Sequence, residues 1–263
     1  MKIFVMVDIE GISGVYAREQ VLQDERRFTE GRRFMTADVN ACVRGLHDAG
    51  VEEIYVCDCH GTSFSLIWDE LSPLADYYIC GRKCGKRFVG IEECDAVILL
   101  GYHAMAGTCE AILEHSYNSR KIQNLCMNGK RVGEIAFDAA IAGEYGKPII
   151  MVSGDDKACE EAKCIMPNVT TACVKRGISI FGAMLLPPEK AHNLIYEKTK
   201  EAVENYKNCT PFKFDKPMEC TVEFVERTLI THADPSYVTV LDGRSVMVLG
   251  DSAEQILFRV QSL

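Results

Sequence analysis

Short apolar runs alternate with stretches of helical periodicity along the first 165 residues. Buried strands are predicted over 2–7, 54–57, 96–100 and 148–152, because each run is continuous, short and rich in branched residues. Between the first two runs, apolar positions three and four residues apart predict an amphipathic helix that Gly50 ends. The helical positions are Met35, Val39, Cys42, Val43 and Leu46. This order predicts a β–α–β unit.

The pattern predicts an α/β fold with a mainly parallel sheet flanked by helices. Continuous apolar strands separated by helices are typical of a sheet that is covered on both faces. Asn128-Gly129 lies between two short strand-like segments and predicts a tight hairpin, since both residues tolerate positive φ. Glu134 follows this hairpin, and helices are predicted over 137–145 and from Asp155 or Asp156 to about residue 165.

The last third of the chain no longer shows the regular alternation of buried strands and helices. A strand over 169–174 precedes a long polar helix that opens at Pro187-Pro188 and extends to about Tyr206. Alternation over 219–226, a turn at Asp242-Gly243 and a capping box beginning at Asp251 predict another strand, a hairpin and a final helix. We therefore predict a catalytic domain over 1–165 and a smaller α+β subdomain over 166–263 that contributes to oligomerisation or to the pocket.

Composition narrows the function classes. The 263 residues carry a formal net charge of −9 and show no Lys/Arg stripe, so binding to nucleic acid is not expected. No apolar run has the roughly 18 residues of a membrane span, and the start lacks a basic segment followed by a long apolar one. We expect a cytoplasmic protein without a membrane partner.

The thirteen cysteines are scattered and odd in number. Most fall within apolar patterns, as Cys42, Cys94 and Cys173 do, and we expect them to behave as small buried hydrophobic residues in a reducing compartment. Cys57 with Cys59, and Cys80 with Cys84, lack the paired spacing of a structural zinc site.

Ionisable residues gather at the downstream ends of the predicted strands. The set comprises Asp8, Glu10, Asp58, His60, His103 and Asp155. Side chains two apart in an extended segment point to the same side, so Asp8 and Glu10 can converge on one cation. Ligands of open α/β sheets bind outside the carboxyl ends of the strands. These positions predict a metal site, although hydrogen-bonded histidines and solvated acidic loops stay open as alternatives.

Asp8, Glu10, His60, His103 and Glu134 together form a candidate ligand set. Two imidazoles and three carboxylates suit zinc, and also cobalt or manganese. Five ligands exceed the three that are typical of a single catalytic zinc, which favours two ions bridged by one carboxylate. Such a pair is typical of metal-assisted hydrolysis.

The order and spacing of several motifs over nearly the whole chain resemble the zinc-dependent D-aminopeptidase family, the DppA type of dipeptide-transport operons. The motifs are Val7-Asp8-Ile9-Glu10-Gly11-Ile12-Ser13-Gly14, Asp58-Cys59-His60, Gly101-Tyr102-His103-Ala104, Glu114-His115-Ser116, Val132-Gly133-Glu134, Val152-Ser153-Gly154-Asp155-Asp156 and Pro167-Asn168-Val169-Thr170-Thr171. The resemblance implies removal of N-terminal D-residues such as D-alanine from short peptides. It also implies a homo-oligomer, a decamer of two pentameric rings.

The resemblance places two zinc ions on Asp8, Glu10, His60, His103 and Glu134, with Asp8 as the bridge. His115 matches the additional active-site histidine of the family and is the candidate for proton transfer or oxyanion stabilisation. An imidazole suits either role near neutral pH. Cys57 and Cys59 depart from the polar residue and the serine that are usual in the family.

Other polar residues have supporting or structural interpretations. Asp58 is a candidate for orienting His60, and Asp155 and Asp156 are candidates for the same kind of support or for helix caps. His47 and His192 are predicted at the surface, and His232 in a loop. Two alternative functions follow from the sequence, a metal-dependent phosphatase and a non-catalytic metal- or peptide-binding oligomer. The two histidine ligands weigh against the magnesium site of a phosphatase.

Overall fold

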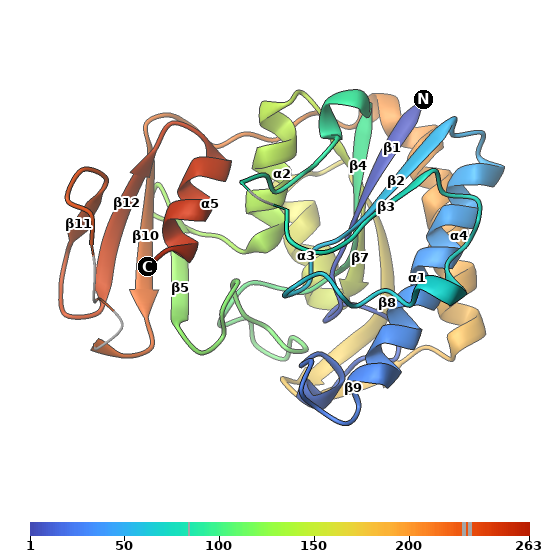
Figure 1. Ribbon diagram of the computed structural model, residues 1–263, viewed down its shortest axis with the longest axis horizontal. Helices are drawn as coiled ribbons and strands as arrows, with labels where there is room; N and C mark the ends of the chain where they lie inside the picture. Colours follow the sequence, from blue (N-terminus) through green and yellow to red (C-terminus); the bar gives the residue numbers. More distant parts are fainter. Residues whose placement is uncertain (84, 228–229, 231–232) are drawn as a thin grey trace.

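The computed structural model describes residues 1–83, 85–227, 230 and 233–263, and it contains two β-sheets (Figure 1). Cys84 and His232, for which the sequence makes predictions, lie outside the described residues. The larger sheet has the strand order β3-β2-β1-β4-β7-β8-β9. Its strands are β1 (Lys2–Val7), β2 (Glu53–Asp58), β3 (Tyr77–Ile79), β4 (Ala96–Tyr102), β7 (Ile149–Asp155), β8 (Thr170–Ser179) and β9 (Gly182–Leu185).

Every neighbouring pair in this sheet is parallel except β8 with β9, which confirms the predicted mainly parallel sheet. Successive strand residues point to opposite faces, and β1 fills both faces with apolar side chains. Val5 belongs to a core with α1 (Phe28–Asp48) and α4 (Pro188–Asn205). Met6 belongs to the other core, with α2 (Glu134–Glu144) and α3 (Asp156–Ile165).

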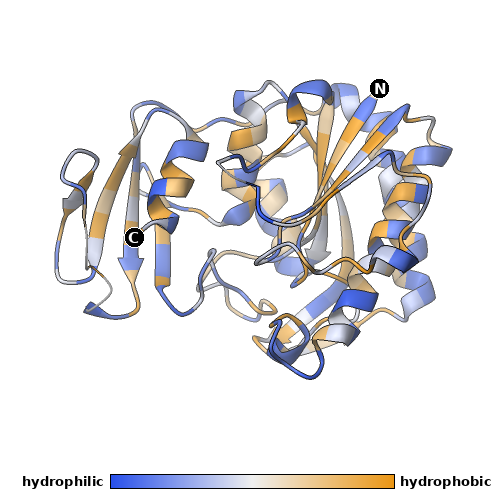
Figure 2. Ribbon diagram, viewed as in Figure 1, coloured by the Kyte–Doolittle hydropathy of each residue, from blue (hydrophilic) through white to orange (hydrophobic). Residues whose placement is uncertain are grey.

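The second sheet is antiparallel and carries one helix. Its order is β11-β12-β10-β5-β6, formed by β5 (Ile122–Met127), β6 (Lys130–Arg131), β10 (Met218–Phe224), β11 (Val238–Val240) and β12 (Ser245–Gly250). Helix α5 (Ala253–Gln261) packs on it, and α2 lies between this unit and the larger sheet (Figure 1). The apolar residues of these elements form one continuous core with the face of the larger sheet that α2 and α3 cover. Figure 2 shows apolar residues along the strands of both sheets and along α2.

The two sheets are interleaved along the chain. Strands β5 and β6 precede β7 but belong to the second sheet, whereas β8 and β9 belong to the first. The predicted domain boundary at residue 165 is a statement about which segments fold independently. Strand pairing does not measure independent folding, so the boundary stays a prediction. Short 3-10 helices at Arg18–Gln20, Trp68–Glu70, Ile91–Glu93 and Tyr206–Asn208 complete the elements.

Two helices begin at residues other than those predicted from the sequence. Helix α2 begins at Glu134, three residues earlier than predicted, so this carboxylate sits in the first turn. The last helix is capped by Ser252, whose Oγ accepts from the Gln255 amide at 3.1 Å, and the predicted cap Asp251 lies one residue outside. The Asn128-Gly129 hairpin is as predicted, with φ of 50° and 78°.

The cysteines that the structure describes are free thiols. Cys42 and Cys94 are buried, as expected for small hydrophobic residues, whereas Cys173 is half-buried. Among the described residues, no helix is both long enough and apolar enough to span a lipid bilayer.

Candidate metal centre

The candidate site lies where the strand order of the larger sheet reverses. Strand β1 has β2 on one side and β4 on the other (Figure 1). Its carboxyl end is therefore at the position where open α/β sheets bind ligands. Asp8 directly follows β1, His60 lies two residues beyond β2, and His103 directly follows β4. The topology therefore brings together residues that are far apart in the sequence.

Close contact between two backbone segments tightens this crevice. The Gly11 amide donates to the Gly101 carbonyl at 2.8 Å, and a Cβ at Gly11 would collide with the Tyr102 carbonyl. Glycine is the residue that permits such an approach. Gly11 thereby brings Asp8 and Glu10 to the end of β4, next to His103.

The five predicted ligands converge on one another. His60 Nδ1 lies 3.1 Å from Asp8 Oδ1 and 3.2 Å from Glu10 Oε2. His103 Nε2 lies 3.2 Å from Glu134 Oε1 and 3.6 Å from Asp8 Oδ2. The two oxygens of Asp8 thus face different imidazoles. Asp8, Glu10, His103 and Glu134 are buried, and His60 is half-buried.

Each site imidazole uses one nitrogen to bond a backbone carbonyl and turns the other toward carboxylates. His60 Nε2 donates to the Val21 carbonyl at 2.8 Å, and His103 Nδ1 donates to the Ala104 carbonyl at 3.0 Å. Because a carbonyl oxygen only accepts, the facing ring nitrogen carries the hydrogen. When a ring is neutral, as metal ligation requires, its second nitrogen has a lone pair that points toward the carboxylates.

His115 joins the same cluster from the loop after β4. Its ring stacks on His103 with centroids 4.0 Å apart and planes 10° apart. Nδ1 donates to the Leu113 carbonyl at 2.8 Å, and Nε2 lies 3.7 Å from Glu134 Oε1. This ring therefore follows the same pattern of one anchored and one available nitrogen.

The loop that carries His115 is conformationally unusual. Glu110, Leu113 and Tyr117 adopt positive φ of 59°, 53° and 60°, a region that costs free energy for residues with side chains. The Tyr117 amide donates to Glu134 Oε1 at 2.7 Å. Asp155 Oδ2 accepts from the Ile112 amide at 2.9 Å and fixes the start of the loop. The fold holds a strained loop in place against the carboxylates.

The charges of the cluster shift its pKa values. Burial lowers the pKa of His103, but the Glu134 carboxylate 3.2 Å away and the charges of Glu10 and Asp8 raise it to about 10. Burial also lowers the pKa of His60, but the negative charges of Glu10 and Asp8 outweigh burial and raise this pKa well above its usual value. Despite burial, the hydrogen bond from His60 and the two imidazole charges keep the pKa of Asp8 low. Protons on the imidazoles therefore balance buried carboxylates.

The cluster fits divalent metal ions. Among the described residues, Glu10 Oε2 and His103 Nε2 are buried atoms without a hydrogen-bond partner, although carboxylates or imidazoles lie close to both. Unpaired buried polar atoms are costly, and a cation would satisfy them. Ligands at about 2.1 Å from a tetrahedral ion are separated by about 3.4 Å, and the imidazole–carboxylate distances of 3.1–3.7 Å match this spacing.

The supporting residues act mainly through the backbone. Asp58 accepts from the His60 amide at 3.1 Å and from the Ser65 amide at 2.6 Å, so it orients the segment and not the imidazole ring. Asp155 is the N-cap of α3, accepting from the Ala158 amide at 2.8 Å. Asp156 lies in the first turn of α3, where its Oδ1 accepts from the Gly177 amide at 2.9 Å.

The other two histidines that the structure describes do not contact the cluster. His47 is exposed, as predicted. His192 is partly exposed, and its Nε2 lies 3.4 Å from Asp38 Oδ1.

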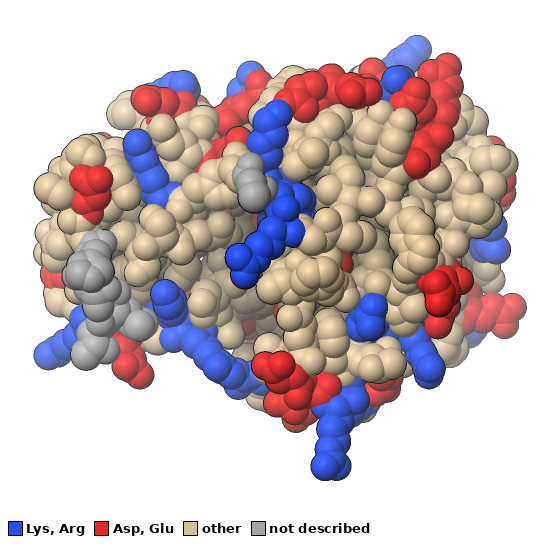
Figure 3. All heavy atoms as spheres, in the orientation of Figure 1, with Lys and Arg blue, Asp and Glu red and all other residues tan. Residues whose placement is uncertain are grey.

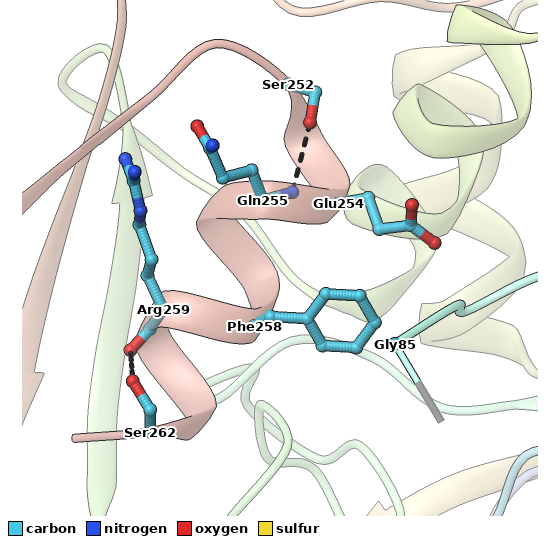
Figure 4. A pocket seen from close by; sticks show the side chains of 7 residues that line it. All are labelled: Gly85, Ser252, Glu254, Gln255, Phe258, Arg259 and Ser262. Atoms are coloured by element: carbon cyan, nitrogen blue, oxygen red, sulfur yellow. Dashed lines mark hydrogen bonds between the residues drawn. The ribbon is translucent and has the colours of Figure 1, made fainter. Parts of the chain in front are cut away.

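A cleft of about 1000 Å³ opens onto the cluster. Its lining includes Asp8, Glu10, His60, His115 and Glu134. Side chains of both charge signs occupy the face shown in Figure 3. A smaller hollow of about 400 Å³ lies against α5, and the polar groups there, such as Ser252 and Ser262, bond within the helix (Figure 4). The larger cleft is therefore the candidate substrate site.

Comparison with known proteins decides the family. The D-aminopeptidase model of the peptidase M55 family matches residues 1–261. The chain belongs to the D-aminopeptidase family. This membership confirms the resemblance inferred from the sequence, and with it an enzyme of the metallo-aminopeptidase class; it leaves the phosphatase and the non-catalytic alternatives without support.

Two relatives illustrate the similarity. A D-aminopeptidase of Bacillus subtilis is 35% identical over 226 residues, which cover 85% of this chain and 81% of the relative. The solved structure of the Zn-dependent D-aminopeptidase DppA from Bacillus subtilis, described as a self-compartmentalizing protease, is 31% identical and superimposes with a TM-score of 0.93. The superposition covers all of this chain and 97% of DppA, so both sheets belong to the shared fold.

Proposed function

We propose that this protein is a dinuclear zinc aminopeptidase that removes the N-terminal residue of short peptides, D-alanyl peptides in particular. Family membership supports peptide hydrolysis, and DppA supports zinc. The observation that carries the proposal is the arrangement of His60, His103 and His115, each with one nitrogen anchored on a carbonyl and the other facing buried carboxylates. Cobalt or manganese would suit the same oxygen and nitrogen donors.

We assign one ion to Glu10 and His60, the other to His103 and Glu134, and Asp8 to both. The two Asp8 oxygens face different imidazoles, which supports the bridging role. When bound, a pair of zinc ions supplies an activated water and polarises the substrate carbonyl. The carboxylates offset the charge of the ions, and the carbonyl bonds keep the rings in a fixed orientation.

His115 is the proposed proton-transfer group. Its Nδ1 is committed to the Leu113 carbonyl, so Nε2 is the nitrogen that exchanges a proton with the reacting groups. The stacking of His115 on His103 keeps Nε2 beside Glu134, at the floor of the cleft. The leaving amine of the peptide must gain a proton, and Nε2 in this position would take one from the attacking water and pass it to that amine.

The protein is also proposed to form a homo-oligomer, for which the family resemblance implies a decamer of two pentameric rings. DppA is described as self-compartmentalizing, which requires several subunits around a shared space. The β8–β9 hairpin exposes more than half of Ile178, Phe181 and Met184. Large apolar side chains exposed together are typical of interaction surfaces. A cytoplasmic location stays a prediction.

Zinc titration of the metal-free protein tests the proposed site. Activity on a dialanyl peptide should rise until two zinc ions are bound per subunit, and Asp8→Ala should lose both ions because it removes the shared ligand. Asp69→Ala, in the Trp68–Glu70 turn outside the lining of the cleft, serves as the matched control and should bind zinc normally. Full activity at one ion per subunit, or zinc content unchanged in Asp8→Ala, would contradict the assignment.

A further inference from the structure

Lys175 places a buried ammonium group against the segment that carries Glu10. Its Nζ donates to the carbonyls of Glu10, Ile12 and Val15 at 2.6, 2.8 and 2.6 Å. The residue is 1% exposed. An ammonium group has three N–H donors, and here all three are used on a single stretch of six residues.

An irregularity in β8 turns this side chain inward. Gly154 and Asp155 of β7 are consecutive, but they pair with Cys173 and Lys175 of β8, so the register shifts between them. Val174 and Lys175 are consequently both fully buried, although neighbouring residues of a regular strand alternate between faces. The bulge directs Lys175 to the carboxyl end of β1, where the segment 10–15 passes.

The segment has need of such donors. Residues 8–17 form neither helix nor strand, so turn hydrogen bonds satisfy only part of the capacity of their carbonyls; that of Ile12 accepts from the Val15 amide at 3.2 Å. A buried carbonyl without a donor is costly. Lys175 satisfies three of these groups at once, one of them the carbonyl of Glu10 itself. The buried ammonium group thus holds three carbonyl groups of the loop close to one another.

We propose that Lys175 is a positioning residue that fixes the Glu10 carboxylate for zinc binding. This inference rests on the proposed zinc site. Loss of the three bonds frees the Glu10 backbone, and the carboxylate then spends less time beside His60. Removing a group that orients a ligand typically weakens metal binding about 10- to 100-fold.

The loop has a second anchor that should keep a Lys175 variant folded. Asp38 of α1 accepts from the Ser13 amide at 2.8 Å and from Ser13 Oγ at 2.6 Å. These bonds hold the middle of the segment through groups that make no hydrogen bond to the lysine. Lys175→Met, which keeps the length of the side chain and removes the donors, is therefore the variant of choice.

Two measurements on Lys175→Met test the proposal. The zinc dissociation constant, measured by competition with a chromophoric chelator, should rise about 10- to 100-fold relative to the wild type. Hydrogen exchange of the metal-free protein should show faster exchange in the peptide that contains residues 10–16. Leu257→Ala, a buried position on α5 in the other core, lowers stability without touching this loop and should leave both quantities unchanged.

The outcomes separate this inference from the proposed function. Failure of the wild type to bind zinc would overturn the zinc site, whereas normal zinc affinity and exchange in Lys175→Met would overturn only the positioning role. If Leu257→Ala weakened zinc binding as much as Lys175→Met, the weakening would reflect lower overall stability, and the positioning role of Lys175 would be overturned. Lys175→Gln retains two donors and should give an intermediate affinity; loss of folding in both lysine variants would overturn positioning in favour of a general structural role.

Discussion

At the scale of the residue, the site depends on how each imidazole is held. The anchored nitrogens of His60, His103 and His115 all bond backbone carbonyls, and these carbonyls belong to loops, not to strands. This arrangement fixes the ring orientation without adding another charge to the cluster. Replacing His115 should therefore impair proton transfer, whereas replacing His60 or His103 should impair metal binding.

His115→Ala should keep the metal and lose turnover. Proton transfer by a positioned side chain typically contributes about 10²- to 10⁴-fold to the rate, and kcat should fall within that range. Metal analysis and steady-state kinetics on the same preparation check this. His47→Ala, at an exposed position, is the control. A fall in zinc content in His115→Ala would instead make His115 a ligand, a role that its nearness to His103 and Glu134 also allows.

The metal-free protein should become less stable as the pH rises from about 6 to about 8. The pKa of His103 is raised to about 10 from an unfolded value near 6.5, so its stabilising proton is fully present below about pH 6.5 and is lost progressively above it. Lys175, whose pKa burial lowers to about 8, acts in the opposite direction at higher pH.

Urea unfolding in the presence of chelator measures this free energy of unfolding. Zinc affinity should change in the opposite sense over the same interval, because protons and zinc compete for the imidazole nitrogens. A metal-free protein that gains stability between pH 6 and pH 8 would contradict the electrostatic description of the cluster.

Residue types at strand ends made much of the candidate site predictable. Asp8, His60 and His103 lie one to three residues beyond predicted apolar runs, so their convergence follows from the rule for open α/β sheets. Lys175 escaped prediction because its partners lie 160–165 residues away and its inward direction depends on a bulge. A charged residue at the end of the apolar run 169–174 was the available signal.

At the scale of the element, the separation between β1 and β4 determines whether the carboxylates meet His103. Gly11 sets this separation through its contact with residues 101 and 102. The start of α2 matters in the same way, since it presents Glu134 in the first turn. The sequence did not indicate that start, because the apolar periodicity begins only after Glu134 and the N-cap Gly133 makes no side-chain bond.

Gly11→Ala should push β1 and β4 apart at the site. Overpacking of this kind costs about 1–3 kcal/mol of stability, and zinc affinity should fall along with it. Thermal unfolding and chelator competition check both effects. At Gly243 an added Cβ would meet atoms no closer than 3.9 Å, so Gly243→Ala is the control and should change neither quantity. Normal zinc affinity in Gly11→Ala would contradict the role given to this close contact.

At the scale of the whole molecule, the parallel sheet was predictable and its companion sheet was only partly so. Alternating strands and helices predict the first from local pattern. The second sheet pairs β10 with β5, whose residues Cys220 and Met127 are neighbours despite their distance in the sequence. Local periodicity carries no information on such a pairing, which tertiary packing decides.

A subunit contact at the exposed β8–β9 hairpin is a proposal that mutation can test. Phe181→Asp should shift the protein to a smaller species in light scattering coupled to size-exclusion chromatography, because a charge would be buried at an apolar contact. Val240→Asp, at a similarly exposed position on the second sheet, is the control and should leave the mass unchanged. A change in mass for Val240→Asp alone would place the contact on the second sheet instead.

The most direct test of the account is the release of free amino acid from paired D-alanyl and L-alanyl dipeptides, each with chelator and after zinc is restored. We predict cleavage that prefers the D-alanyl peptide, stops with chelator and returns with zinc. Cleavage of the L-peptide alone would contradict the substrate, and cleavage that persists in the fully metal-free protein would contradict the metal centre.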